Sequence, residues 1–278
     1  MNRVRNYQKE LEQMIERIGA AKECPPTLFL HSCCAPCSSY VLEYLRQYFR
    51  ITVFYFNPNI TEDAEYCKRV EEQKRLIAAY NEELTKMVSA NPDGVAGQDA
   101  IAKQYAGAMQ HVGAVEDAVA VQDAVAEQYA GLVQDTGTVH GADRQQAESA
   151  AYRIDVIEGD YEPQRFYEMA KGLEQCPEGG ERCFACYELR LRETAKLARE
   201  GGYDYFTTTL SISPLKNAAK LNEIGEKLAQ EYGAVWLPSD FKKKDGYKRS
   251  IELSKEYGLY RQDYCGCVYS KRQISAGT

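Results

Sequence analysis

The chain has 278 residues, of which 44% are hydrophobic, and it can bury the full core of one large α/β domain. No run of about 18 apolar residues occurs, which excludes a recognisable transmembrane helix. The N-terminal stretch alternates charged and apolar residues at helical spacing, unlike a signal peptide, so we expect a cytoplasmic protein without membrane association. The formal net charge of −7 argues against non-specific nucleic-acid binding.

The first predicted elements alternate between helix and strand. An amphipathic helix over residues 4–18 precedes a short apolar strand over 27–32. The tight loop CCAPCSS follows, then a helix over 39–49 and a second strand over 51–56. This order is a βαβ unit with an expected right-handed crossover. Ligands of such sheets bind beyond the carboxyl ends of the strands, where the first loop lies.

The alternation of helices and strands resumes after residue 150. One helix is predicted to begin with Ser213 as its N-cap and Pro214 in its first turn. Several βα units in series predict a doubly wound parallel sheet. The expected elements are a helix over 183–200, a strand over 203–210, a helix over 213–233, a strand over 234–238 and a helix over 246–257.

Residues 90–150 interrupt this alternation with an Ala-rich segment. Eighteen residues from Gln98 recur from Gln122, a period of 24 residues, and 11 of the 18 positions are identical. Apolar residues at a spacing of four predict a short helix in each copy. The segment contains no cysteine, so we expect a duplicated helical insertion without a catalytic role, with docking of a partner as the alternative. Residues 1–89 and 151–278 are then expected to form a single α/β catalytic domain.

Seven of the ten cysteines fall into three clusters, each on an expected loop or helix start. In a cytoplasmic protein, clustered thiols more often bind metals than form disulfides. Thiolates are ligands for zinc, copper(I) and iron–sulfur clusters, and helix N-termini favour the anionic sulfur. The clusters are Cys33-Cys34-Ala35-Pro36-Cys37, Cys183-Phe184-Ala185-Cys186 and Cys265-Gly266-Cys267.

The number of clustered cysteines limits the kind of metal site. A structural zinc or a [4Fe–4S] cluster takes four ligands, which leaves three for a second metal with an open position. The adjacent pair Cys33-Cys34 and the pair Cys265/Cys267 are each suited to supply one ligand to each of two neighbouring centres. Spacing leaves open which sulfur binds which centre. The remaining candidates are expected to be packed or surface residues: Cys24, Cys67, Cys176 and His31.

Five stretches of the chain match the motifs of a known family: LHSCCAPCSSY (30–40), FYFNPNI (54–60), EGGERCFACYELRL (178–191), YDYFTTTLSISPLKN (203–217) and SDFKKKDGYKRSIELSKEYGLYRQDYCGC (239–267). Together they resemble the QueH-type epoxyqueuosine reductases over nearly the whole chain except the insertion. This resemblance implies a HUP-like Rossmannoid fold related to the PP-loop ATPases. The motif HSCCAPCSS occupies the place of the glycine-rich loop of those ATPases, so use of ATP is not expected.

The resemblance also implies an oxidoreductase activity, the two-electron reductive deoxygenation of epoxyqueuosine to queuosine at the wobble position of tRNA. It implies a [4Fe–4S] cluster beside a mononuclear iron, both held by the seven clustered cysteines. Some members carry Asp at the position of Cys37, which indicates a ligand of the lone iron. An external electron donor is expected to reload the site. The proton-donor candidates, chosen because they adjoin the ligands, are Tyr187, Asp263 and Tyr264.

A basic run near the C-terminus has two interpretations. On composition alone it is a solvated lysine-rich loop, although residues 181–278 carry a net charge of +4. An anticodon-loop substrate would instead require cations on its phosphates and aromatic side chains against its bases. The residues then expected to bind tRNA are Lys242, Lys243, Lys244, Lys248 and Arg249.

Two alternative functions fit parts of this pattern. A zinc-stabilised tRNA-binding module would use the thiolates without redox chemistry, and would be colourless where an iron–sulfur protein is brown. A PP-loop-like tRNA sulfur-transferase shares the implied fold and sometimes a cluster. Its requirement for ATP and for a phosphate-binding glycine loop counts against it.

Overall fold

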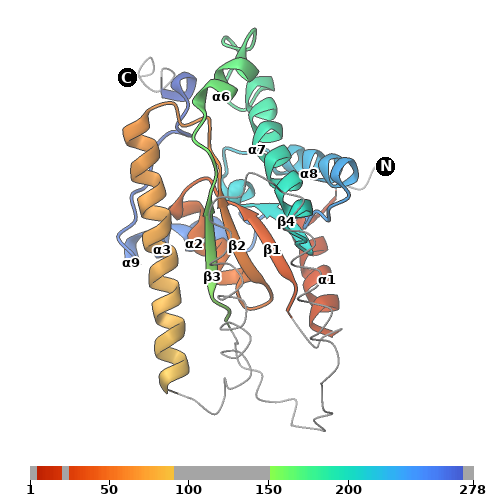
Figure 1. The fold of residues 1–278 in the computed structure, drawn as a ribbon, viewed down its shortest axis with the longest axis vertical. Helices are drawn as coiled ribbons and strands as arrows, with labels where there is room; N and C mark the ends of the chain where they lie inside the picture. Colours follow the sequence, from red (N-terminus) through yellow and green to blue (C-terminus); the bar gives the residue numbers. More distant parts are fainter. Residues whose placement is uncertain (1–4, 21–24, 91–150, 272–278) are drawn as a thin grey trace, which may run out of the picture. The chain divides into compact units, whose positions relative to one another are not determined.

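A computed structural model of the protein describes residues 5–20, 25–90 and 151–271, arranged around a parallel β-sheet (Figure 1). In this described part, four strands lie in the order β3-β2-β1-β4, and all neighbouring strands are parallel. The α/β fold with a parallel sheet is therefore confirmed. The strands are β1 (Thr27–His31), β2 (Arg50–Tyr55), β3 (Ile154–Glu158) and β4 (Tyr205–Thr208).

The direction of the chain across the sheet reverses at β1. Leu30 of β1 is in register with Val53 of β2 on one side and with Thr207 of β4 on the other. The chain runs from β1 to β2 and β3, and then returns to pair β4 with the free edge of β1. Ligand sites form beyond the carboxyl ends of parallel strands at such a reversal. The loops that follow β1 and β4 therefore begin side by side at the place where a site is expected.

Helices cover both faces of the sheet, because the strands are apolar on both sides. Leu28 and Leu30 of β1 belong to a core with α1, α2 and α3, whereas Phe29 belongs to a second core with α7 and α8. The fold is thus doubly wound, as predicted. The helices are α1 (Tyr7–Ala20), α2 (Ala35–Leu45), α3 (Asp63–Ala90), α6 (Pro163–Ala170), α7 (Glu181–Glu200), the 3₁₀ helix η2 (Thr209–Ile212), α8 (Ala218–Tyr232) and α9 (Gly246–Glu256).

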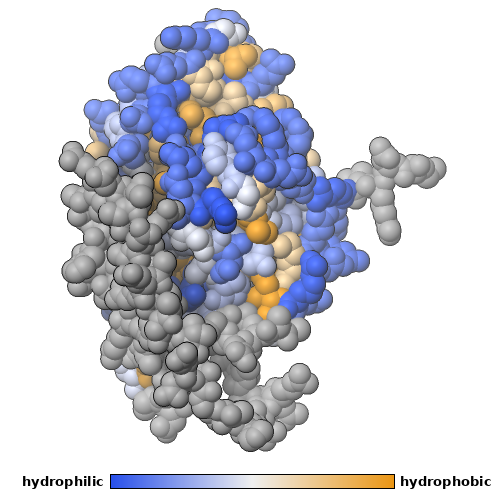
Figure 2. All heavy atoms as spheres, turned by 45° about the vertical axis from the view of Figure 1, so that its right-hand side comes forward, coloured by the Kyte–Doolittle hydropathy of each residue, from blue (hydrophilic) through white to orange (hydrophobic). Residues whose placement is uncertain are grey.

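The surface carries isolated apolar residues. Among the described helices, none is both long and apolar enough to cross a membrane. On the face shown in Figure 2, hydrophobic residues form small separate patches among hydrophilic ones. Two large apolar side chains are notable for their position, because Leu215 (68% exposed) and Tyr247 (36% exposed) line the cavity described below.

One predicted helix begins later than the sequence suggests. The helix expected from Ser213 begins at Ala218, because the Asn217 side chain accepts a hydrogen bond from the Lys220 amide and is the N-cap. The Ser213 hydroxyl instead accepts from the amide of Leu215 at 3.3 Å. Residues 213–217 are therefore a loop rather than a first helical turn.

Two strand assignments also differ. The sequence does not predict β3, an edge strand in which only Ile154 is fully buried. Residues 234–238, predicted as a strand, form a single parallel bridge between Phe206 and Trp236. The predicted insertion and its duplication lie outside the described residues, apart from Ala90 at the end of α3, so the domain boundaries stay a prediction.

Candidate metal centre

The loop after β1 brings three thiols together. β1 ends at His31, and Cys34 takes an extended conformation as the N-cap of α2. Pro36 is tolerated in the first turn because its missing N–H has no helical partner there. The Sγ atoms of Cys33, Cys34 and Cys37 all lie within 4.8 Å of one another, at the positive end of α2. This is the one group of three ligand-type side chains at such spacing in the part of the chain that the structure describes.

A buried polar network holds this loop in place. The hydroxyls of Ser32 and Ser38 lie 2.6 Å apart, at 2.7 and 2.9 Å from Oε1 of Gln73 on α3. Asn57 donates to the Ser32 carbonyl at 2.8 Å, and Ser38 donates to the Cys34 carbonyl at 3.0 Å. The backbone on both sides of the cysteines is thus fixed, so their side chains have a preset geometry.

The second pair of thiols lies at the start of α7. Cys183 and Cys186 are three residues apart, which places them on one helical face, and both are buried. The amide of Gly179 donates to Sγ of Cys183 at 3.2 Å. The helix begins at Glu181 with Gly180 as N-cap, so both sulfurs lie near its positive end.

The third pair lies in a loop that is fixed to α3. The Sγ atoms of Cys265 and Cys267 are 3.4 Å apart. Asn59 and Arg69 both donate to the Cys265 carbonyl, at 3.0 and 3.2 Å. Gly266 has φ +102°, a conformation that side-chain-bearing residues rarely adopt.

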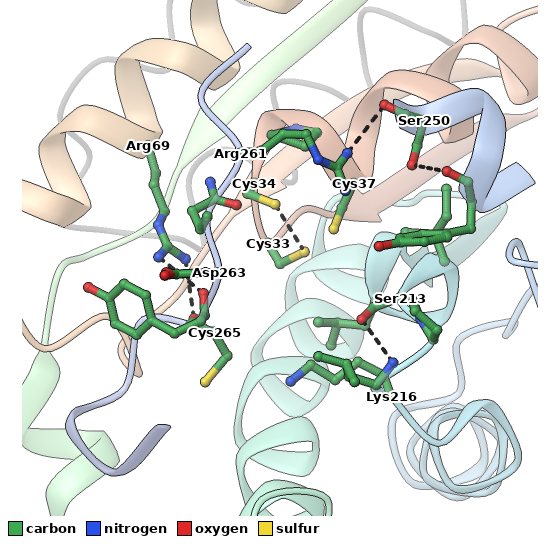
Figure 3. Close-up of a pocket in the computed structure, with 18 of the residues that line it drawn as sticks. Cys33, Cys34, Cys37, Arg69, Ser213, Lys216, Ser250, Arg261, Asp263 and Cys265 are labelled. Atoms are coloured by element: carbon green, nitrogen blue, oxygen red, sulfur yellow. Dashed lines mark hydrogen bonds between the residues drawn. The ribbon is translucent and has the colours of Figure 1, made fainter. Parts of the chain in front are cut away.

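Cysteines of the first and third clusters line one cavity of about 150 Å³. Cys265 lines this cavity together with Cys33, Cys34 and Cys37, and Figure 3 shows these four side chains around one space. Cys186 and Cys267 pack within one buried cluster, and Cys33 packs against the core that contains Cys183. Four of the seven cysteines that the sequence singles out thus line the cavity, and the other three, Cys183, Cys186 and Cys267, lie in buried clusters that contain or adjoin some of those four. Their arrangement at the carboxyl ends of β1 and β4 is the site expected from the sheet order.

Among the described residues, the other thiols and His31 lie elsewhere or have ordinary packing, whereas Cys24 lies outside these residues. Cys67 is exposed on α3, and Cys176 does not line the cavity. His31 is fully buried, with Thr208 at one ring nitrogen and the Phe56 carbonyl at the other. Burial, and then the nearby Arg190, lower the pKa of His31 to about 3, so it is neutral. All nine cysteines that the structure describes are free thiols.

The electrostatics of the site favour one thiolate in the first cluster and one in the third, whereas hydrogen bonds with those two sulfurs raise the pKa of Cys34, Cys37 and Cys267. Hydrogen bonds with Cys34 and Cys37 hold the pKa of Cys33 well below its ordinary value. The hydrogen bond shared with Cys267, and then the Lys216 ammonium, lower the pKa of Cys265 to about 5 against the opposing effect of burial. Each of these two clusters thus holds one anionic sulfur, the form that binds metals.

Four cations line the cavity, and the sequence did not single out three of them, Arg69, Arg190 and Lys216. Arg190 follows Cys186 by four residues on α7, so helical periodicity places it on the same face as Cys183 and Cys186. That spacing is a signal from which it could have been found. Lys216 was assigned to a helix, and the loop conformation of 213–217 is what brings it to the cavity.

The three proton-donor candidates separate into two groups. Asp263 and Tyr264 line the cavity, whereas Tyr187 does not. The Tyr187 hydroxyl is buried without a hydrogen-bond partner, and burial raises its pKa to about 12. Asp263 and Tyr264 are therefore better placed to reach a molecule in the cavity.

The five basic residues expected to bind tRNA also differ in their surroundings. Lys242 pairs with Asp240 at 2.8 Å, Lys244 with Glu12 at 2.5 Å and Arg249 with Glu43 at 2.5 Å. Lys243 and Lys248 are exposed, and neither has an acidic partner within 4 Å among the described residues. Lys248 follows Tyr247, which lines the cavity.

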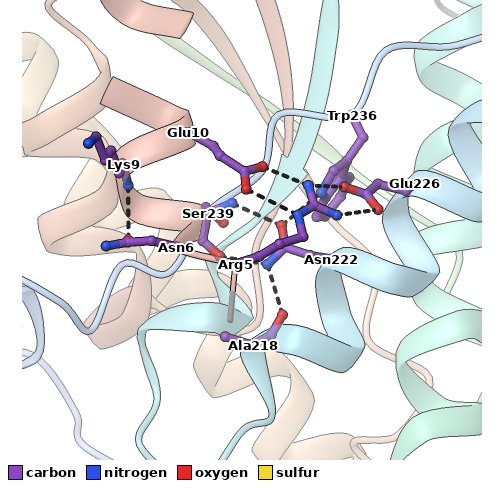
Figure 4. Close-up of polar contacts among 9 residues, drawn as sticks. All are labelled: Arg5, Asn6, Lys9, Glu10, Ala218, Asn222, Glu226, Trp236 and Ser239. Carbon is purple, nitrogen blue, oxygen red and sulfur yellow. Dashed lines mark hydrogen bonds and ion pairs between the residues drawn. The ribbon is translucent and has the colours of Figure 1, made fainter. Parts of the chain in front are cut away.

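Asn222 on α8 uses all the hydrogen-bonding groups of its side-chain amide to fix the segment around Trp236 and Ser239 (Figure 4). Nδ2 of Asn222 donates to the carbonyls of Ala218 and Ser239, and its Oδ1 accepts from the Trp236 indole and the Ser239 amide. The Ser239 hydroxyl lies 3.0 Å from that of Ser211 in η2. This contact connects η2, which lines the cavity, to the irregular segment around Trp236. Figure 4 also shows Arg5 paired with Glu10 and Glu226, which connects the start of α1 to α8.

Substitution of Gly225 tests this packing. A Cβ at Gly225 would lie 2.3 Å from Cδ2 of Trp236, whose indole is fixed by Asn222. We expect Gly225→Ala to lower the free energy of unfolding by about 3 kcal/mol, measured by chemical denaturation. Gly19→Ala is the control, because no atom lies within 4 Å of its Cβ, and it should raise stability by up to about 1 kcal/mol. Equal stability of the two variants would contradict this view of the Trp236 contact.

The fold and the site together define a class of protein, a doubly wound α/β protein with a cysteine cluster that could hold a metal at the reversal point of its sheet. The family model for the epoxyqueuosine reductase QueH matches residues 28–96 and 140–273. The chain therefore belongs to the QueH family of epoxyqueuosine reductases.

Individual relatives agree with this assignment. The epoxyqueuosine reductase QueH of Staphylococcus epidermidis is 36% identical over 267 residues, covering 95% of this chain and 84% of the relative. The one of Streptococcus pyogenes is 32% identical over 96% of this chain and 78% of the relative. The one of Thermotoga maritima is 38% identical over 122 residues, 43% of this chain and 64% of the relative.

Proposed function

We propose that the protein is an epoxyqueuosine reductase that converts epoxyqueuosine to queuosine in tRNA. The reaction consumes two electrons and two protons, replaces the epoxide by a carbon–carbon double bond, and releases the oxygen as water. The observation that carries this proposal is that cysteines of two clusters, Cys33, Cys34 and Cys37 with Cys265, line one cavity in a member of this family. An external electron donor supplies the electrons.

The donor set fits iron. Four of the seven clustered thiols line the cavity, all seven are buried or half-buried and free, and two of them have a depressed pKa. Four of the seven would hold a [4Fe–4S] cluster, and three, including Cys37, would hold a mononuclear iron. When bound, this group supplies the electrons and an electrophile for the epoxide oxygen.

The residues of the chain have separate tasks around the substrate. Arg69 and Arg261 add positive charge to the cavity wall, and Arg261 is held by the Ser250 carbonyl and the Ser254 hydroxyl. Asp263 and Tyr264 are positioned to deliver protons at the oxygen that leaves. Leu215 and Tyr247 offer apolar surface at the cavity, against which a nucleobase can stack.

An assay on modified tRNA tests the function. Anaerobically purified, iron-loaded protein is mixed with epoxyqueuosine-containing tRNA and dithionite, and the nucleosides are then identified by mass spectrometry. The proposal predicts conversion to a nucleoside that lacks one oxygen. Unchanged epoxyqueuosine after many equivalents of iron-loaded protein would contradict it. A colourless protein that binds zinc and tRNA but not iron would support the zinc-stabilised module instead.

The tRNA-binding residues are tested by charge reversal at the two lysines without acidic partners. We expect Lys243→Glu/Lys248→Glu to weaken tRNA binding and to reduce the salt dependence of binding by about one unit per lysine lost. Binding is measured by fluorescence anisotropy at several salt concentrations. Lys86→Glu is the control, since Lys86 is about 25 Å along α3 from Arg69 at the cavity. The iron content should stay unchanged in all variants. An unaltered salt dependence in the double variant would place the tRNA elsewhere.

A further inference from the structure

Two buried cations, Arg190 and Lys216, line the cavity with the cysteines, and among the described residues only one carboxylate lies within 4 Å of either. Arg190 is only 4% exposed, and its guanidinium donates to the Cys186 carbonyl at 3.2 Å and to Oδ1 of Asn57 at 3.3 Å. Both acceptors are uncharged, and no carboxylate lies within 4 Å of Arg190 in the described part of the chain. The Lys216 side chain is 10% exposed, and its nearest carboxylate is that of Glu178 at 3.6 Å.

A buried charge is costly unless another charge compensates for it. Around Arg190 the groups that can supply this charge are the thiols of the site. Arg190 donates to the Cys186 carbonyl and lines the cavity together with Cys33 and Cys265. These three residues come from all three cysteine clusters, so Arg190 lies beside each of them.

Such a cation acts on any redox group that the thiolates hold. A one-electron reduction adds one negative charge to the site, and the electron comes from the external donor. A fixed positive charge in a poorly solvated environment stabilises the reduced form more than the oxidised form. A fixed negative charge does the opposite. The site contains both kinds, because Glu178 also lines the cavity.

We propose that Arg190 and Lys216 raise the reduction potential of the iron–sulfur group, and that Glu178 partly offsets Lys216. Both cations reach the cavity walls, and neither is free to move away, since each is at least nine-tenths buried. Arg190 is the stronger of the two because it has no acidic neighbour. This inference rests on the proposed cofactors, but not on the identity of the substrate.

The test is a redox titration of the iron-loaded protein, followed by electron paramagnetic resonance. At a fixed potential, Arg190→Gln is expected to lower the ratio of reduced to oxidised protein about tenfold, which is about 59 mV for one electron. Arg190→Lys keeps the charge but loses the hydrogen bond to Asn57, and should stay near the wild-type potential. An equal shift in both variants would assign the effect to the lost hydrogen bonds and overturn the proposal.

Two further variants keep the test decisive if Arg190→Gln fails to load iron. Lys216→Gln should shift the potential downward, and Glu178→Gln should shift it upward, because it removes the negative charge beside Lys216. Shifts of the same sign in these two variants, or none, would overturn the proposal. Arg46→Gln is the control, a buried arginine beyond the other end of α2 from Cys34, and its potential should match wild type.

The outcome is separable from that of the function assay. Wild-type protein without reducible iron would overturn the proposed cofactors before any variant is compared. Wild-type protein that is reducible but inactive on epoxyqueuosine would overturn the proposed function. The reduction potentials of the variants could still be compared, so the inference about Arg190 and Lys216 would still be tested.

Discussion

Cys265→Ala is expected to abolish reductase activity, by more than about 100-fold, and to lower the iron content of the protein. Cys265 lines the cavity with the cysteines of the first loop, and its Sγ is 3.4 Å from that of Cys267. Its loss removes the sulfur of the third cluster that faces the open space. Iron is quantified on anaerobically purified protein, and activity is measured with epoxyqueuosine-containing tRNA.

Cys67→Ala is the matched control, because Cys67 is an exposed free thiol that does not line the cavity. Its iron content and activity should equal those of the wild type. A Cys265→Ala protein with normal iron and normal activity would show that the third cluster is not part of the metal site.

Gly266→Ala is expected to damage the same loop without removing a sulfur. Gly266 has φ +102°, and a Cβ there would lie 2.7 Å from Cγ1 and 3.3 Å from Cα of Ile60. The backbone must shift, and this shift displaces Cys265 and Cys267 on either side. We expect a loss of about 3 kcal/mol in unfolding free energy from strain and overlap, together with a large loss of bound iron.

Gly258→Ala separates strain from overlap. Gly258 also has a positive φ, +57°, but no atom lies within 4 Å of its Cβ. It should lose about 1 kcal/mol of stability and keep its full iron content. If Gly266→Ala keeps its iron as well, the geometry of the Cys265–Cys267 loop is not critical for the site.

The parts of the fold that could be predicted from sequence are those with continuous apolar runs. The segments that form β1 and β2 are buried on both faces, so most of their residues are apolar. β3 was missed because it is an edge strand in which exposed residues such as Asp155 and Glu158 interrupt the run. The segment around Trp236 looked like a strand, yet its pairing with β4 is limited to one bridge.

The start of α8 was predicted wrongly because the sequence contains two possible N-caps. Ser213 and Pro214 have the pattern of a helix start, but Asn217 is a second N-cap four residues later, and the structure uses it. The earlier residues are free to line the cavity as a loop, and Lys216 gains its position in this way. No single-sequence pattern distinguishes these two caps, since the choice depends on tertiary contacts.

The cysteines of the site were visible in the sequence, whereas its cations were not. Cysteine clusters are rare enough in a chain to be noticed, and the sheet order explains why distant clusters meet. Arg69, Arg190 and Lys216 are three among 34 lysines and arginines. Arg190 has a signal in its helical spacing from the cysteines of α7, whereas only their position at the cavity distinguishes the other two. The basic run at Lys242–Arg249 was visible because its residues are close together in the sequence. In the structure, three of its five named residues form ion pairs.

The most direct test of the account is the iron and acid-labile sulfide content of anaerobically purified protein, expressed per chain. Seven thiolates shared between a [4Fe–4S] cluster and a three-ligand iron predict about five irons and about four sulfides. About four irons with four sulfides would contradict the second centre. A colourless protein that contains zinc in place of iron would contradict the redox site altogether.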